Sequence, residues 1–342
     1  SAVTGGGSAA TGGGSAATGG GSAVTGGGSA VTGGGSASTG GGSATTGGGS
    51  AVTGGGSAAT GGGSATDGGT PSPATVREVR LGTLPGVSYG FIEYLPQGYT
   101  TGSNFPVVIF LHGSGQVGNG TTQLAAVRQV GPPRYVDTGT NYPFVMISPQ
   151  TGGSWSSWEM ENLMGSLLTY VLANYKVDPK RLYVTGLSLG GSGTWDLARF
   201  HSDKVAALLP VCGGSWGFSQ TEADRIVNAN IAVWTFHGTA DGQTAIMTDD
   251  QWISMMGITL GSQQPSVTSN YPTNAVGPYS ATYNAQTHGW VWVQGQTPLT
   301  AGGTTPSSQV IYTRIGGGPH SIWDSVYTDP QVFTWLLQQH RP

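Results

Sequence analysis

A glycine-flanked serine joins an apolar run to a helical run in residues 182–201, which read LYVTGLSLGGSGTWDLARFH. The run before Gly186 has the length and apolar content of a buried strand, and residues 191–201 follow helical periodicity. Gly186 to Gly190 match Gly-x-Ser-x-Gly, in which the glycines permit a strained turn that lifts the serine hydroxyl above a sheet. Such turns are common, but strand, turn and helix together predict that Ser188 is a nucleophile.

Further apolar runs of strand length follow the same pattern, and helical periodicity lies between several of them. Strands that alternate with helices predict an α/β fold in which helices cover both faces of a mostly parallel sheet. In such sheets the reactive groups lie at the carboxyl ends of the strands. The strand-like runs are 105–111, 144–149, 206–211, 231–236 and 309–315, a helix is expected at 161–175, and residues 76–94 are expected to form a starting β-hairpin.

Two other residues have the positions that a serine nucleophile requires of its partners. A serine hydroxyl is weakly nucleophilic, so it requires a base, and the base requires a group that orients it. Asp241 closes the sequence His-Gly-Thr-Ala-Asp after a strand-like run, and His320 closes Gly-Gly-Gly-Pro-His after another. The order serine, aspartate, histidine is that of α/β-hydrolases. We therefore expect Ser188, Asp241 and His320 to form a catalytic triad.

Neighbouring residues offer alternatives for two members of this triad. Asp249 and Asp250 could replace Asp241, although they lie in the next helical segment. His288 could replace His320. The positions of Asp241 and His320 directly after strand-like runs favour them over these alternatives.

Other polar residues near the same motifs are interpreted as structural. His112 and His237 each precede a glycine at a strand end and are expected to bond loop backbone. Asp324 is expected to cap or orient its own loop. Cys212 is the single cysteine, which excludes an internal disulfide and a multi-cysteine metal site, and it is expected to be a buried thiol. We expect neither a metal nor a cofactor.

Attack by serine creates an oxyanion that requires preorganised hydrogen-bond donors. The backbone N–H of Leu189 directly follows the nucleophile, and a second donor is expected in the loop 112–115, His-Gly-Ser-Gly. Ser114 is the residue that we expect to supply it. Because these donors belong to the backbone, the side chains at the two positions do not identify them.

With these residues in view, the domain resembles a carboxylesterase group of the α/β-hydrolases. This group is related to feruloyl esterases and polyhydroxybutyrate depolymerases and includes peptidases of prolyl-oligopeptidase type. The resemblance implies the α/β-hydrolase fold and the triad Ser188, Asp241 and His320, but it does not imply a substrate. It runs over most of 105–339, with matching stretches at 108–113, 148–150, 177–183, 186–196, 237–241 and 320–324.

The sequence departs from that family between Asp241 and His320, where it carries an insertion at about 263–308. Residues 288–293 alternate like a strand, so one interpretation is an additional hairpin that packs its aromatic side chains on the domain. The other is a lid or an aromatic platform for substrate. Two tryptophans after residues 149–150 could line the same cleft or fill the core. The aromatic residues considered for substrate binding are Trp155, Trp158, Trp290 and Trp292.

The composition restricts the partners of the chain. A formal net charge of −4 with only 8% charged residues leaves no basic patch, so nucleic acid is not expected as a partner. No apolar run approaches the roughly 18 residues of a membrane span. Residue 1 is serine, lysines are few, and serine, threonine and tryptophan are abundant. From these features we expect a removed leader and a secreted protein.

Residues 1–67 form an arm in which Thr-Gly-Gly-Gly-Ser-Ala-x recurs without interruption. This composition buries too little apolar surface to offset chain entropy, which favours a spacer. The repeat is stricter than a spacer requires, which favours self-association into an oligomer or filament through extended segments stacked between chains. We expect a Pro/Gly junction at 68–75 and an α/β-hydrolase domain at 76–342.

The sequence therefore predicts a secreted serine carboxylic-ester hydrolase that its repeat arm arrays in an oligomer or filament. Its expected partners are an ester substrate, either small or attached to a polymer, and other copies of the chain. Two alternatives remain at this point. One is a structural filament protein with a weakly active hydrolase-like domain, and the other is a serine peptidase of the same fold.

Overall fold

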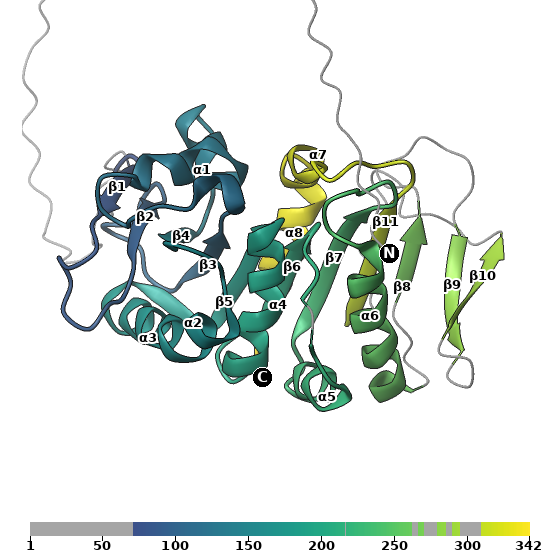
Figure 1. Cartoon of the computed structure of the whole chain (residues 1–342). Helices are drawn as coiled ribbons and strands as arrows, with labels where there is room; N and C mark the ends of the chain where they lie inside the picture. Colours follow the sequence, from purple (N-terminus) through teal and green to yellow (C-terminus); the bar gives the residue numbers. More distant parts are fainter. Residues whose placement is uncertain (1–70, 216, 262–265, 270–278, 285–288, 295–308) are drawn as a thin grey trace, which may run out of the picture. The chain divides into compact units, whose positions relative to one another are not determined.

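The computed structural model describes residues 71–215, 217–261, 266–269, 279–284, 289–294 and 309–342 (Figure 1). The chain divides into two units, Ser1–Thr66 and Asp67–Pro342, and the described residues belong to the second. The repeat arm predicted at 1–67 and the first residues of the junction lie outside the described part of the chain. Among the described residues, none of the helices combines the length and hydropathy that a membrane crossing requires.

The strands of the described residues form one sheet in the order β1-β2-β4-β3-β5-β6-β7-β11-β8-β9-β10. All pairings from β4 to β8 in this order are parallel, and the pairings at both edges are antiparallel. The predicted α/β fold with a mostly parallel sheet is therefore confirmed. The strands are β1 Thr75–Val79, β2 Gly90–Leu95, β3 Phe105–Leu111, β4 Val145–Gln150, β5 Val177–Leu187, β6 Ala207–Val211, β7 Ala232–Gly238, β8 Ser266–Ser269, β9 Tyr279–Asn284, β10 Gly289–Gln294 and β11 Val310–Ile315.

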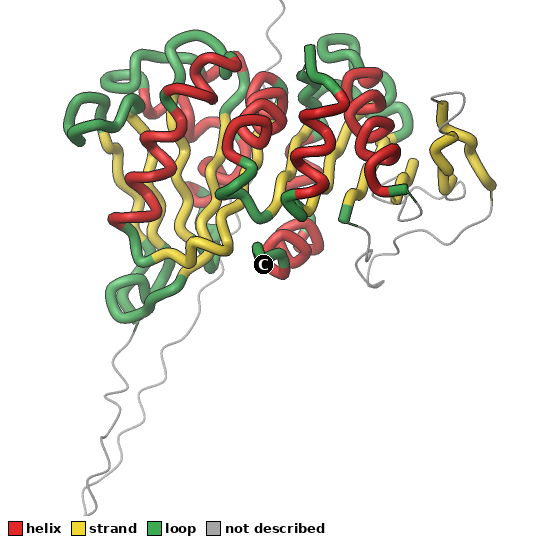
Figure 2. Tube along the Cα trace, turned by 90° about the horizontal axis from the view of Figure 1, so that it is seen from below, coloured by secondary structure: helices red, strands yellow, loops and turns green. Residues whose placement is uncertain are grey.

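Helices cover both faces of the sheet, as the alternation of strands and helices predicts (Figure 2). One apolar core joins the sheet to α2 through α6, and a second core on the opposite face joins it to α7 and α8. The helices are α1 Gly131–Asp137, α2 Ser157–Asn162, α3 Met164–Asn174, α4 Leu189–His201, α5 Gln220–Asn228, α6 Ile246–Leu260, α7 Trp323–Tyr327 and α8 Pro330–Gln338, with short 3₁₀ helices η1 Ser114–Gln116 and η2 Leu124–Gln129.

Strand β3 shows how a continuous apolar run serves both cores. Val107, Ile109 and Leu111 belong to one core, whereas Val108 and Phe110 belong to the other. This division follows from the alternation of side chains along a strand. All five are fully buried, and complete burial of such a side chain contributes about 1.5–3 kcal/mol. The central strands are thus held from both sides, which fixes the positions of the loops at their carboxyl ends.

The helix expected at 161–175 is two helices, α2 and α3, which meet at Leu163. A capping box starts α2 earlier than the periodicity indicates. The Ser156 hydroxyl accepts the Glu159 N–H at 3.3 Å, and the Glu159 carboxylate accepts the Ser156 N–H at 3.1 Å. The starting hairpin is present as β1 and β2, which pair from Thr75 with Leu95 to Val79 with Phe91.

The segment 263–308, which we interpret from the sequence as an insertion, contributes the described strands β8, β9 and β10 to one edge of the sheet. Strand β8 pairs in parallel with β11, and β9 and β10 form an antiparallel hairpin beyond it. The strand expected at 288–293 is present as β10, where Trp290 is opposite Tyr283 and Trp292 is opposite Ala281. The side chains of this hairpin lie outside the described residues, so both interpretations of its tryptophans stay predictions.

Candidate active site

Ser188 occupies the turn between β5 and α4 with φ of 54° and ψ of −120°. A serine rarely adopts this backbone conformation, and holding it costs about 1–3 kcal/mol. The flanking glycines are required because the neighbouring backbone comes close. A Cβ added at Gly186 would lie 2.3 Å from the carbonyl oxygen of Gly190, and one added at Gly190 would lie 1.9 Å from that of Leu111. The turn therefore presents Ser188 at the sheet edge where β3 and β5 end.

Asp241 and His320 come from loops that follow two adjacent parallel strands, β7 and β11. The strands pair up to Gly238 and Ile315, and the loops that follow are bonded to each other. The Ala240 N–H donates to the Gly318 carbonyl at 2.9 Å. A Cβ at Gly238 would lie 2.3 Å from the same Gly318 oxygen, so the close approach of the loops requires glycine there.

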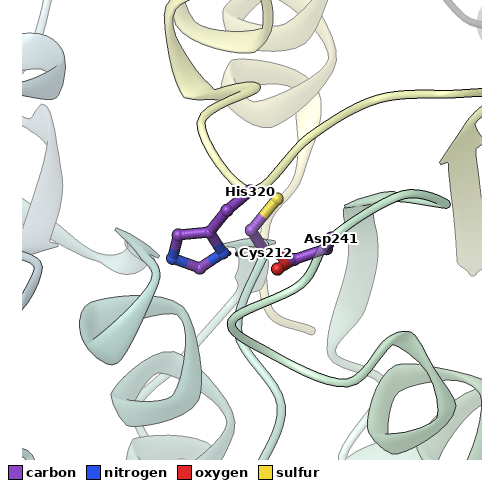
Figure 3. Close-up of side chains that lie close together, drawn as sticks. All are labelled: Cys212, Asp241 and His320. Carbon is purple, nitrogen blue, oxygen red and sulfur yellow. Dashed lines mark hydrogen bonds and ion pairs between the residues drawn. The ribbon is translucent and has the colours of Figure 1, made fainter.

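The three side chains predicted as a triad form one chain of hydrogen bonds. His320 Nε2 lies 2.8 Å from Ser188 Oγ, and His320 Nδ1 lies 2.7 Å from Asp241 Oδ2. Figure 3 shows the imidazole of His320 directed at the carboxylate of Asp241. A carboxylate can only accept, so Nδ1 donates to Asp241 and leaves Nε2 as the acceptor for the serine hydroxyl. This is the arrangement in which an imidazole can remove a proton from serine.

Asp241 is held as a carboxylate by the groups around it. Its side chain has no exposed area, and burial alone would raise its pKa. The hydrogen bond from His320 and the N–H groups of Gln243 and Thr244, which donate to Oδ1 at 2.8 and 2.9 Å, outweigh burial and lower the pKa below its ordinary value. Asp241 therefore stays ionised at neutral pH and can orient His320.

Two backbone N–H groups beside Ser188 have no partner among the described residues. Leu189 is the first residue of α4 and Ser114 is the first residue of η1, and neither N–H donates a hydrogen bond there. The first N–H groups of a helix have no acceptor within the helix. The loop that carries Ser114 lies against the end of β5, because a Cβ at Gly113 would be 2.9 Å from the Leu187 side chain. Both donors are thus free at this edge of the sheet.

His112 and Trp155 hold the loop before Ser114. His112 Nδ1 donates to the Gly113 carbonyl at 2.7 Å, and its Nε2 accepts the Thr151 N–H at 3.2 Å. Burial lowers the pKa of His112 to about 4, although the bond to Gly113 favours the protonated form. The indole N–H of Trp155 donates to the His112 carbonyl at 2.9 Å. His112 is structural, as expected.

The four tryptophans considered for substrate binding differ in their surroundings. Trp155 is only 2% exposed and packs against Tyr89 and His112, so it fills the core and does not line a cleft. Trp158 lies on α2 and is 63% exposed. Of the two interpretations for the pair, the core therefore applies to Trp155. The side chains of Trp290 and Trp292 lie outside the described residues.

The alternatives for Asp241 lie elsewhere in the structure. Asp249 is on α6 and is bonded to His237 Nδ1 at 2.8 Å and not to His320. Asp250 pairs with Arg314 at 3.4 Å. His288 is outside the described residues.

Asp324 was expected to cap or orient its own loop, and among the described residues its side chain bonds another helix instead of capping that loop. Its carboxylate accepts from Tyr135 Oη at 2.6 Å and from Arg134 at 3.4 Å, both on α1. The side chain therefore joins α7 to a helix far away in the sequence, because the fold places α1 beside α7.

Cys212 is fully buried, as expected, and burial raises the pKa of its thiol to about 12. Its sulfur lies beside two members of the triad (Figure 3). Cys212, Asp241 and His320 offer possible metal-ligand atoms that lie within 4.8 Å of one another. His320 Nδ1 and Asp241 Oδ2 already bond each other, so two of the three ligand positions are in use.

The sequence did not reveal that His237 bonds to carboxylates. His237 does bond loop backbone, because its Nε2 lies 3.1 Å from the Thr244 carbonyl oxygen. It also contacts Asp249 and Asp241 at 2.8 and 3.2 Å. The position of His237 four residues before Asp241 is a local signal for one contact, but nothing local indicates Asp249, which α6 brings back to the end of β7.

Comparisons with known proteins relate the chain to esterases. The chain matches the model of the family described as "Putative esterase" over residues 83–296, which is more than half of its length. A bifunctional acetylxylan esterase/xylanase of Neocallimastix patriciarum is 26% identical over 150 residues, which cover 40% of this chain and 19% of that protein. Poly(3-hydroxyalkanoate) depolymerase C of Paucimonas lemoignei is 28% identical over 145 residues, which cover 40% of this chain and 33% of that protein.

The chain thus spans less than two thirds of the length of these relatives. A solved structure of a thermostable esterase has the same fold, with a TM-score of 0.51 at 20% identity over 78% of this chain and 63% of that chain. The family match contains Ser188 and Asp241 and ends before His320. On the extent of that match, the chain belongs to the esterase family.

Proposed function

We propose that this chain hydrolyses carboxylic esters by transferring the acyl group first to Ser188 and then to water. The observation that carries this proposal is the unbroken hydrogen-bond chain from Ser188 Oγ through His320 to Asp241, with distances of 2.8 and 2.7 Å. Such a chain supplies both the base and the group that stabilises its charged form. Membership of the esterase family supports an ester as the substrate.

In the first half of the reaction, Ser188 Oγ attacks the carbonyl carbon while its proton passes to His320 Nε2. The carbonyl oxygen becomes an oxyanion, and we assign the N–H groups of Leu189 and Ser114 as the donors that bind it. The intermediate then collapses, the bond to the alcohol oxygen breaks, and His320 returns the proton to the leaving alcohol. Asp241 stays ionised and stabilises the imidazolium throughout.

In the second half, water attacks the acyl-serine. His320 takes a proton from the water, the same N–H groups bind the second oxyanion, and the bond to Ser188 Oγ breaks as His320 returns the proton to it. The products are the carboxylic acid and the free enzyme. The strained backbone at Ser188 supports this role, because it holds the hydroxyl in place before substrate arrives.

The acyl group that we propose is short or belongs to a polymer ester. The relatives named above act on acetylxylan or poly(3-hydroxyalkanoate) according to their names; the first is a polysaccharide that bears acetyl esters and the second is a polyester. A panel of acetyl, feruloyl and hydroxybutyrate esters, compared by kcat/KM, would identify the acyl group. A peptide amide in the same panel distinguishes an esterase from a peptidase, since turnover of the peptide that Ser188→Ala abolishes contradicts the proposal.

The test of the mechanism is the rate of 4-nitrophenyl acetate hydrolysis by the wild-type protein and by Ser188→Ala. We expect the substitution to lower kcat by about 10⁴-fold or more. Ser192→Ala is the matched control, because Ser192 lies on α4 and donates to the Gly214 carbonyl. We expect it to retain the wild-type rate within about threefold. If Ser188→Ala and wild type have the same rate, the chain is a filament protein with a hydrolase-like domain.

We also propose that residues 1–67 mediate self-association and that the protein acts outside the cell. The uninterrupted seven-residue repeat supports the first part, because a spacer does not require such regularity. Sedimentation of the full chain and of a variant without residues 1–67 tests it. We expect an oligomer for the full chain, a monomer for the truncated chain, and equal ester turnover per subunit. An assembly that survives the deletion leaves the arm as a spacer.

A further inference from the structure

A second histidine lies directly behind Asp241, between two carboxylates. His237 is at the end of β7, and its side chain has no exposed area. Its Nδ1 lies 2.8 Å from Asp249 Oδ2, and its Nε2 lies 3.2 Å from Asp241 Oδ2 and 3.1 Å from the Thr244 carbonyl oxygen. The oxygen Asp241 Oδ2 is the one that also accepts from His320. The two imidazoles therefore meet at a single carboxylate oxygen.

The partners of His237 determine its protonation. A neutral imidazole has one donor and one acceptor, whereas the imidazolium has two donors. The Thr244 carbonyl and the Asp241 carboxylate can only accept, so Nε2 must donate. Nδ1 faces Asp249, and Asp249 itself accepts from the indole N–H of Trp195 at 2.8 Å. Both ring nitrogens thus face carboxylate or carbonyl oxygens, and the imidazolium, with its two donors, satisfies both.

Burial alone would lower the pKa of His237. The hydrogen bond and the charge of Asp249, the Thr244 carbonyl and the charge of Asp241 outweigh burial and raise the pKa above its ordinary value. This direction agrees with the assignment that the hydrogen-bond partners give.

We propose that His237 is a positioning residue, held as an imidazolium by Asp249, that fixes Asp241 and sets the strength with which Asp241 attracts a proton to His320. This inference rests on the proposed ester hydrolysis and names a residue that adjusts the basicity of the catalytic base. A positive charge against Asp241 Oδ2 opposes a second positive charge on His320. The charge on His237 therefore reduces the net stabilisation that Asp241 gives to the imidazolium of His320 when His320 takes the serine proton.

The other titratable groups around His237 are either paired or neutral, so their net charge is small. Asp250 on α6 is paired with Arg314 on β11 at 3.4 Å. Tyr312 and Cys212 are neutral, because burial raises the pKa of both. The charges that remain next to His237 are Asp241 and Asp249, with His320 on the far side of Asp241. The low-pH side of the pH profile of kcat/KM, its acid limb, therefore reports on the charges of His237, Asp241, Asp249 and His320.

The test compares that acid limb in wild type, His237→Gln, and the double variant His237→Gln with Asp249→Asn. His237→Gln removes the cation and leaves Asp249 uncompensated, so we expect the midpoint to move upward by about one pH unit. The double variant also removes the uncompensated charge, so we expect it to recover part of that shift. A residue that only supports the fold would give neither the shift nor its recovery.

The matched control is His201→Gln, the same substitution at a buried histidine on α4 that bonds the Met160 carbonyl at 2.7 Å. We expect its acid limb to stay at the wild-type pH. If the acid limb of folded His237→Gln stays at the wild-type pH while Ser188→Ala abolishes turnover, this inference is overturned. The proposed ester hydrolysis then still holds. Turnover that survives Ser188→Ala overturns the hydrolysis mechanism instead.

Imidazole ¹⁵N NMR of the wild-type protein gives a readout that does not depend on a variant folding. We expect both ring nitrogens of His237 to show the shifts of an imidazolium at pH 7. The shifts of a neutral tautomer at that pH contradict the proposal, even if none of the His237 variants folds.

Discussion

Gly190 lies so close to Leu111 that a Cβ at the glycine would be 1.9 Å from the leucine carbonyl oxygen. This contact joins the first turn of α4 to the end of β3, and it holds the nucleophile turn beside the loop that carries Ser114. The atoms nearest to such a Cβ belong to the backbone of Leu111 and His112 and not to a flexible side chain. Moving them away from a substituted residue 190 would therefore cost free energy.

We therefore predict that Gly190→Ala lowers the free energy of unfolding by about 3 kcal/mol, because the added methyl overpacks rigid backbone. Urea denaturation measures the change. Gly153→Ala is the control, since a Cβ there meets nothing within 4 Å, and we expect a change within about 0.5 kcal/mol. Equal midpoints for the two variants would show that the turn relaxes.

Asp241→Asn is predicted to lower kcat for 4-nitrophenyl acetate by about 10⁴-fold while the protein stays folded, because an amide does not hold His320 in the required tautomer. Circular dichroism and steady-state kinetics measure the two effects. Asp324→Asn removes a carboxylate that bonds α1 and is 55% exposed, so we expect activity within about twofold of wild type. A larger loss in Asp324→Asn than in Asp241→Asn contradicts the assignment of the triad.

The raised pKa of His237 predicts a pH dependence of stability. Burial alone would lower this pKa, but the bonds to Asp249 and Thr244 raise it, so the folded protein binds the proton more tightly than the unfolded chain. The resulting stabilisation is fully present below about pH 6.5, the value of an unfolded histidine, and is lost as pH rises through the folded pKa. The free energy of unfolding of wild type minus that of His237→Gln should therefore shrink above about pH 6.5. A difference that stays constant from pH 5.5 to 9 would refute it.

Cys212 is predicted to be inert in the folded protein, because it is fully buried and its thiol has a pKa of about 12. Reaction with 5,5′-dithiobis(2-nitrobenzoate) at pH 8 measures this. We expect the native protein to react about 100-fold more slowly than the same protein in denaturing urea. Rapid reaction of the native protein would mean that the space beside Asp241 and His320 opens to solvent.

The sheet and the meeting of Ser188, Asp241 and His320 could be expected from the sequence because both depend on local patterns. Apolar runs of strand length identify the strands, and parallel strands end at one edge, so residues directly after them come together. Gly186 and Gly190 mark the turn because only glycine avoids the backbone contacts there. The positions of the strands, of the turn and of the three triad residues could each be predicted from a few neighbouring residues.

Contacts between distant segments could not be inferred in the same way. Asp324 was interpreted through its own loop, yet its partners lie on α1, far back in the chain. The contact of His237 with Asp249 depends on how α6 packs against β7, and the burial of Trp155 depends on the loop that follows β3. Neither the spacing of residues in the sequence nor the composition predicts which distant segments pack against each other.

The pairing of β7 with β11 has a consequence for how the family can diversify. Asp241 and His320 each follow one strand of the adjacent pair β7 and β11 within a few residues, and the described strands of the chain between them, β8, β9 and β10, lie at the sheet edge beyond β11. We therefore expect that the chain between the two residues can be exchanged or lengthened without changing the geometry of the proton-transfer pair.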